Sequence, residues 1–185
     1  MAGLEVLVSR APLVPASLTE RFHGVGAQVG AIATFTGVVR GTDIKALEIE
    51  HYPGMTERVI EERMLTAVKT WGLSGAQVIH RIGVLPVGEP IVWVAVSASH
   101  RAEAFAACEY LIDFLKVEAP FWKKEHFANG MAGWVDTRDA DIERTRRWGP
   151  TGPESEGSRN ESAATHRSRQ ECGPSDTARS ATTYS

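Results

Sequence analysis

Cationic side chains gather in one stretch of the chain, between Ser99 and Glu125. The stretch opens with Ser99-His100-Arg101 and closes with Pro120-Phe121-Trp122-Lys123-Lys124-Glu125. Five of its residues are cationic or can become so, namely His100, Arg101, Lys116, Lys123 and Lys124. Neither metal-ligand spacing nor a nucleophile-elbow motif accompanies them. A cationic group of this kind is typical of a site for an anionic small molecule, in particular one that carries phosphate.

The triplet Ser99-His100-Arg101 lies where a predicted strand ends and a predicted helix begins. Ser99 or His100 can cap this helix, and the free N–H groups at a helix N-terminus favour an anion. An exposed Arg101 is unfavourable beside the positive end of the helix dipole by about 0.3–1 kcal/mol, so helix stability does not explain it. The two interpretations are an anion-binding arginine and a solvent-facing arginine that tolerates this penalty.

Lys116 ends the same predicted helix, where the helix dipole favours any cation. A plain C-terminal lysine is therefore the simplest interpretation of this residue. Pro120 follows closely, limits extension of the helix and directs the chain into a predicted strand over residues 121–127. This turn would let Lys116 face the side chains of that strand.

Within the strand over residues 121–127, alternation puts Phe121, Lys123, Glu125 and Phe127 on one face. A lysine buried between aromatic side chains has a depressed pKa unless an anion offsets the loss of solvation. Lys124 points to the other face, where it is a solvated charge or a contact at the rim of the site.

Weaker signals come from three other features. Arg40 ends a predicted strand beside Gly41, a position that is common both in ligand sites and on surfaces. The six histidines include no i,i+4 pair and no cysteine neighbour, so we predict no metal site and no cofactor. Cys108 lies on the apolar stripe of a predicted helix, which favours a small buried hydrophobic residue over a nucleophile.

The elements that must position these residues follow from hydrophobic periodicity and turn signals. We predict strands over residues 4–8, 31–40, 46–52, 77–82, 91–98, 121–127 and 133–135. We predict a short helix over 15–22, two main helices over 56–71 and 101–116, and a helical turn or two over 139–148. Strands interrupted by two main helices suit an α+β domain with a mixed sheet better than a doubly wound sheet.

Composition limits the class of protein. The chain has 185 residues, 43% of them apolar, and a formal net charge of -3, so any positive site must be local and nucleic acid is an unsuitable partner. Two cysteines cannot form a disulfide framework, which indicates a reducing compartment, and we predict the cytoplasm. We see no leader peptide and no apolar run that could span a membrane.

The sequence changes character after Trp148. Residues 149–185 contain no Leu, Ile, Val, Met, Phe or Trp, and Gly, Pro, Ser and Thr supply about half of them. Such a segment cannot bury enough apolar surface to offset the entropy of ordering. We therefore predict one folded domain over 1–148 and a disordered, low-complexity tail over 149–185.

Six segments, taken in order, resemble the large, catalytic subunit of molybdopterin synthase. They fall across roughly residues 30 to 138, and the order of all six makes the resemblance specific. The segments are Thr34-Phe35-Thr36-Gly37-Val38-Val39-Arg40, Glu50-His51-Tyr52-Pro53-Gly54-Met55-Thr56, Ile79-His80-Arg81-Ile82-Gly83, Ser99-His100-Arg101, Asp113-Phe114-Leu115-Lys116 and Ala119-Pro120-Phe121-Trp122-Lys123-Lys124-Glu125.

The resemblance implies an α/β-hammerhead fold and a homodimer. It also implies a small ubiquitin-like partner subunit, whose Gly-Gly C-terminus carries a thiocarboxylate into each active site. The implied reaction transfers two sulfurs to cyclic pyranopterin monophosphate and forms the dithiolene of molybdopterin, in molybdenum cofactor biosynthesis. Because the sulfur comes from the partner, no catalytic cysteine is needed.

The resemblance also implies roles for single residues. Lys116 matches the essential lysine near the partner's thiocarboxylate, and Lys123 matches a second functional lysine. Arg138 matches an arginine thought to reach the site of the neighbouring subunit. Val38 stands where relatives often carry a basic residue. The implied substrate-binding set is Val38, Val39, Arg40, His100, Arg101, Lys116, Lys123, Lys124, Glu125 and Arg138.

Two other functions compete with this enzyme. The first is a non-catalytic module that docks a ubiquitin-like protein or an anionic ligand. Docking alone would not require two lysines directed at one pocket, so the presence of both Lys116 and Lys123 favours the enzyme. The second is a sulfurtransferase that carries a persulfide on Cys108, which the position of Cys108 on an apolar stripe disfavours.

Overall fold

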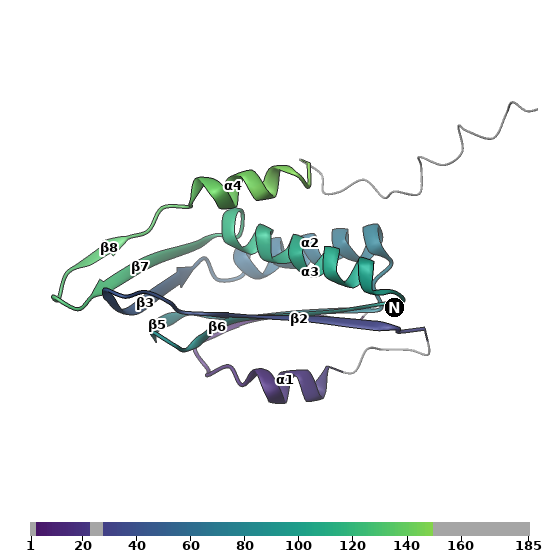
Figure 1. The fold of residues 1–185 in the computed structure, drawn as a ribbon, viewed down its shortest axis with the longest axis horizontal. Helices are drawn as coiled ribbons and strands as arrows, with labels where there is room; N and C mark the ends of the chain where they lie inside the picture. The colour runs from purple at the N-terminus through teal and green to yellow at the C-terminus, as the bar shows by residue number, and fades with distance from the viewer. Residues whose placement is uncertain (1–2, 23–27, 150–185) are drawn as a thin grey trace, which may run out of the picture. The chain divides into compact units, whose positions relative to one another are not determined.

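Eight strands and four helices make up the described part of the chain, which comprises residues 3–22 and 28–149 of a computed structural model (Figure 1). The elements, in order, are β1 (Gly3–Ser9), α1 (Pro15–Arg21), β2 (Ala31–Val38), β3 (Ile44–His51), α2 (Met55–Trp71), β4 (Gly75–Arg81), β5 (Gly83–Pro86), β6 (Pro90–Ala98), α3 (Arg101–Val117), β7 (Phe121–Phe127), β8 (Ala132–Trp134) and α4 (Asp139–Arg146).

The first sheet has the strand order β1-β4-β6-β2 and is mixed, because β1 and β4 run parallel while the other pairs are antiparallel. The helices α2 and α3 cover one face, and α1 covers the other (Figure 1). Along β6, Val94 and Val96 belong to the core with α2 and α3, whereas Trp93 and Ala95 belong to the core with α1. Burial on both faces explains the unbroken apolar run of this strand.

The second sheet has the order β5-β3-β7-β8, and all its pairs are antiparallel. A small core of Val39, Ile49 and Leu85 lies against it. The chain passes from β4 of the first sheet into β5 of the second at Gly83, whose φ of 88° is a conformation that glycine adopts readily. Strand β5 was not predicted, since four residues bounded by glycine and proline resemble a turn.

The helices follow the predicted periodicity. In α2, Ile60, Met64 and Ala67 are fully buried at i, i+4 and i+7. The helix ends at Trp71, as predicted, and Gly72 follows it in the left-handed conformation. In α3, Cys108 is buried on the apolar stripe, which confirms its predicted position.

The predicted α+β fold, with a mixed sheet and two main helices, is confirmed, although the division into two sheets was not predicted. Apart from Gly149, the predicted tail lies outside the described residues, so the boundary after residue 148 stays a prediction. Among the described residues, no helix combines the length and the apolar character that a membrane crossing requires.

Candidate functional site

The turn between α3 and β7 brings two lysines together. Lys116 lies in the last turn of α3, and Lys123 lies on β7. The Thr56 hydroxyl from α2 holds this turn: it donates to the Pro120 carbonyl at 3.3 Å and accepts from the Tyr52 N–H at 3.1 Å. Because Thr56 is fully buried, the turn is anchored in the protein interior.

Lys123 lies on the inner face of the second sheet. It pairs across the strands with Ile49, which is almost fully buried. Burial is the main cause that lowers the pKa of Lys123 below its usual value, and the charge of Lys116 lowers it further. Asp141 acts in the opposite direction and raises this pKa, while Arg138 lowers it. The site is therefore a partly desolvated cluster of cations with one carboxylate beside them.

A neutral histidine forms one wall of this cluster. The His80 ring stacks on Phe121, with 3.9 Å between ring centroids and 17° between the planes. Burial lowers the pKa of His80 to about 3, so the ring is uncharged at neutral pH. Its Nδ1 lies 2.8 Å from the Arg81 carbonyl oxygen, which requires a proton on Nδ1. His80 therefore shapes the site without adding a cation.

Helix α4 brings its carboxylate to the cluster by packing antiparallel on α3 (Figure 1). Lys116 Nζ donates to Asp141 Oδ1 at 3.1 Å. At the other end of α4, Arg147 and the indole N–H of Trp148 both donate to the buried Asp113 carboxylate, at 2.7 and 2.9 Å. The position of Asp141 is thus fixed by contacts that do not involve Lys116.

Replacing Asp113 with alanine should loosen α4. Arg147 and Trp148 would lose their shared acceptor, and charged hydrogen bonds of this kind contribute about 1–3 kcal/mol. Hydrogen exchange measured by mass spectrometry should show faster exchange in α4 and unchanged exchange in α1, which packs on the other face of the first sheet. Equal protection of α4 in the variant and the wild type would show that the helix is held by other contacts.

The predicted anion-binding residues at the other end of α3 lie far from the lysines. His100 is the N-cap residue, without a side-chain capping bond, and Arg101 is the first helical residue. Both are exposed. Since an α-helix rises 1.5 Å per residue, Arg101 and Lys116 are separated by about 22 Å along the axis. Within one chain, the structure joins Lys116, Lys123 and Arg138 but leaves His100 and Arg101 apart.

The segment before Gly41 divides into exposed and buried residues. Val38 and Arg40 are exposed, whereas Val39 is 3% exposed and belongs to the core of the second sheet. The Val39 N–H donates to Glu89 and its carbonyl accepts from Gly88. The side chain and the backbone N–H of Val39 are therefore both engaged within its own chain, and its binding role stays a prediction.

The remaining predicted residues of β7 point to different faces. Glu125 shares the face of Lys123, because it pairs with Leu47 two positions along the same strands. Lys124 lies on the opposite face, with its Nζ 5.5 Å from the centre of the Trp134 ring. This placement agrees with the predicted opposite face, and the binding role of Lys124 stays a prediction.

Three residues of the site were not predicted: Asp141, Asp113 and His80. The spacing of Asp141, Thr145 and Trp148 at i, i+4 and i+7 was the available signal, since it puts all three on one face of the last helix. Nothing in the sequence indicated the ring stack of His80 on Phe121, which depends on the pairing between the two sheets.

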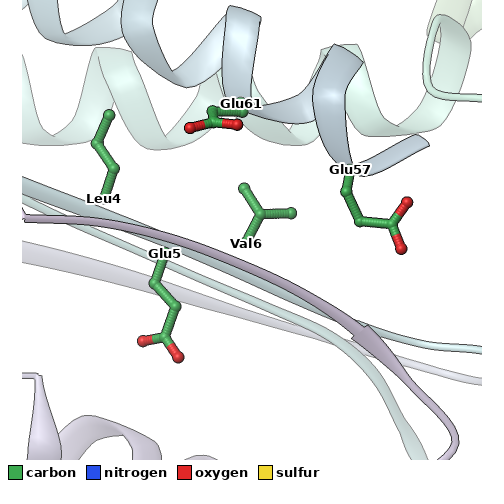
Figure 2. Close-up of a pocket in the computed structure, with 5 residues that line it drawn as sticks. All are labelled: Leu4, Glu5, Val6, Glu57 and Glu61. Atoms are coloured by element: carbon green, nitrogen blue, oxygen red, sulfur yellow. The ribbon is translucent and has the colours of Figure 1, made fainter. Parts of the chain in front are cut away.

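A pocket elsewhere in the molecule lies between β1 and α2 and has the opposite charge. Its lining residues are Leu4, Glu5, Val6, Glu57 and Glu61 (Figure 2). In Figure 2, Leu4 and Val6 point toward α2 while Glu5 points to the other side of the strand. Carboxylates at its rim would repel an anion, so this pocket does not serve the predicted anionic substrate.

Comparison with known proteins supports one family. Residues 8–118 match the family described as MoaE protein. The molybdopterin synthase catalytic subunit of Ralstonia nicotianae is 51% identical over 126 residues, which cover 66% of this chain and 71% of the relative. That of Cereibacter sphaeroides is 50% identical over 147 residues, which cover 78% of this chain and all of the relative.

Solved structures show the same fold. The molybdopterin biosynthesis MoaE protein from Burkholderia ambifaria aligns with a TM-score of 0.67 at 39% identity, over 80% of this chain and 99% of its own. The molybdopterin synthase from Staphylococcus aureus aligns with a TM-score of 0.62 at 30% identity, over 74% of this chain and 98% of its own.

Proposed function

Because the chain belongs to the MoaE protein family, we propose that it transfers two sulfurs to cyclic pyranopterin monophosphate and so forms the dithiolene of molybdopterin. Its curated relatives are molybdopterin synthase catalytic subunits, and the chain is a sulfur-transferring enzyme of molybdenum cofactor biosynthesis. The proposed sulfur donor is the C-terminal thiocarboxylate of a small ubiquitin-like subunit. The proposed location is the cytoplasm.

The observation that carries this proposal is the convergence of Lys116 and Lys123 on one partly buried site. An ammonium at the end of α3 suits a terminal thiocarboxylate, because both its charge and its N–H donors match the ligand. Lys123 is half-buried, and the lowered pKa of its amine brings proton transfer closer to neutral pH. A module that only docks a partner does not require a lysine whose pKa is lowered.

The proposed chemistry is an acyl-type transfer. The thiocarboxylate sulfur forms a C–S bond at a side-chain carbon of the pterin while a C–O bond at that carbon breaks, and the departing oxygen takes a proton or stays with the phosphate. Water then breaks the acyl C–S bond, which leaves the sulfur on the pterin and the partner with a carboxylate. Lys116 orients the thiocarboxylate and stabilises the negative charge that develops on it. Lys123 moves protons during ring opening and sulfur attack. Two transfers require two partner molecules for each pterin.

We further propose that a complete pocket uses two copies of the chain. The pterin phosphate would be bound by Arg101 and His100, which lie about 22 Å from Lys116 within one chain. A two-fold dimer can bring the N-terminal end of one α3 to the C-terminal end of the other, and it does so at both sites at once.

Anaerobic incubation of the subunit with thiocarboxylated partner and cyclic pyranopterin monophosphate tests the proposal. We expect molybdopterin, detected by mass spectrometry. Partner with an ordinary C-terminal carboxylate is the matched control and should give no product. Absence of product from folded, partner-bound subunit would refute the proposal.

A persulfide on Cys108 is the competing source of sulfur. Cys108 is buried, and this burial raises the pKa of its thiol to about 11, so the reactive thiolate is scarce at neutral pH. We expect Cys108→Ala to lower the free energy of unfolding by about 1 kcal/mol, through a small cavity, and to keep turnover. Urea denaturation and the molybdopterin assay check the two parts. Loss of turnover in the folded variant would revive the persulfide mechanism.

A further inference from the structure

One acidic residue of α4 belongs to the lysine site, the cluster around Lys116 and Lys123, although it lies outside the α3–β7 turn. Asp141 accepts a hydrogen bond from Lys116 Nζ at 3.1 Å, and its side chain is only 19% exposed. Two other carboxylates of this helix, Asp139 and Glu143, are exposed, and Glu143 pairs with its own helix neighbour Arg146. Asp141 is therefore the acid that α4 directs inward.

The position of Asp141 is imposed by the packing of α4. Thr145, one turn further along the helix, donates to the Asp113 carbonyl at 3.4 Å, and Arg147 donates to the Asp113 carboxylate. Trp148 packs edge-on against Trp71, with 5.9 Å between ring centroids. An ion pair formed by two free surface side chains contributes little, because ordering both costs entropy. Here one partner is already held in place.

We propose that Asp141 is a positioning residue of the sulfur-transfer site: its carboxylate fixes the Lys116 ammonium and balances the cationic charge around Lys123. This inference rests on the proposed function. An ammonium has three N–H donors, and Asp141 uses one of them. The other two stay available for an incoming thiocarboxylate, so Asp141 orients Lys116 without closing the site.

The charges that face Lys123 come from several elements. Lys116 faces it from α3, Asp141 from α4, Arg138 from the N-cap of α4, and the neutral His80 from β4. His51 and Glu125 share its face of the second sheet. Lys116 and Arg138 both favour the neutral amine of Lys123, whereas Asp141 favours the ammonium. Removal of the Asp141 charge should therefore make Lys123 lose its proton at lower pH.

The first test is made on the isolated subunit, without partner or substrate. Lysines carrying a 13C label at Cε are titrated by NMR, and Lys123→Arg assigns the signal of Lys123. In Asp141→Asn the Lys123 signal should titrate at lower pH than in the wild type. Asp141→Glu should restore the wild-type curve, and Glu143→Gln, which removes an exposed acid from the same helix, should leave it unchanged. An unchanged Lys123 titration in folded Asp141→Asn would overturn the inference.

The second test measures turnover of the reconstituted enzyme. Asp141→Asn should lower kcat about fivefold without raising the KM for the pterin, since it removes an orienting contact and no substrate contact. The limb of the pH–rate profile that Lys123 controls should move to lower pH, whichever form of the amine is active. Normal kcat and an unmoved profile would overturn the inference. Absence of product from wild-type enzyme, together with the shifted titration, would instead refute the proposed function.

Discussion

Replacement of Lys116 with alanine is expected to reduce molybdopterin formation by at least about a hundredfold, with little change in stability. Its ammonium is the group that we propose to orient the thiocarboxylate, and no other residue of α3 can replace it at that end of the helix. Its side chain is 47% exposed, so its ion pair with Asp141 should contribute no more than about 1 kcal/mol to folding. The molybdopterin assay and thermal unfolding of the same preparation check both parts.

Lys69→Ala is the matched control for this prediction. Lys69 also lies in the last turn of a 17-residue helix, α2, but is exposed and outside the lysine site. This variant should retain full activity. Activity of Lys116→Ala above about a tenth of the wild type would remove Lys116 from the proposed role, because a tenfold effect corresponds to only about 1.4 kcal/mol of barrier.

The second large effect is recovery of activity when two inactive variants are mixed. We expect Arg101→Ala and Lys116→Ala each to be nearly inactive as homodimers. If each pocket takes Lys116 from one chain and Arg101 from the other, a mixed dimer has one intact site and one site with both lesions. A random mixture contains about half mixed dimers, so about a quarter of wild-type activity should return. Native mass spectrometry confirms subunit exchange, and mixed dimers without activity would contradict a shared pocket.

Arg138 provides the control for this experiment. The resemblance implies that it reaches the neighbouring subunit's site, yet in the structure its charge acts on Lys123 of its own chain. A mixture of Arg138→Ala with Lys116→Ala should therefore stay inactive. If each site takes Arg138 and Lys116 from the same chain, each site of a mixed dimer lacks one of the two residues. Recovery in that mixture would show that Arg138 serves the neighbouring site.

Much of the fold follows from local patterns. Alternation and the flanking Pro120 predicted the bounds of β7, and the apolar stripe of α3 predicted burial of Cys108, because both features depend on neighbouring residues alone. The division into two sheets was not predictable in this way. It depends on the turn at Gly83 and on the pairing of β3 with both β5 and β7, contacts between segments that are distant in sequence.

The same distinction holds for the site. Lys116 and Lys123 were predictable because one proline turn joins their elements. For Asp141 the spacing indicated only that it shares a helix face with Thr145 and Trp148, because its contact with Lys116 depends on how α4 packs against α3, through Asp113 and Trp148. The separation of Arg101 from Lys116 follows from the length of α3. It is the reason for our proposal that Arg101 of one chain serves Lys116 of the other, whereas the resemblance implied a shared pocket through Arg138.

The central claim, that both sulfurs come from the partner's thiocarboxylate, is tested most directly by isotope labelling. The partner is thiocarboxylated with 34S, and the subunit is produced with sulfur of natural abundance. After anaerobic turnover, the mass of the pterin product is measured by mass spectrometry. The account predicts a product with two 34S atoms, in wild-type enzyme and in Cys108→Ala alike. A product that carries unlabelled sulfur from the subunit would contradict it.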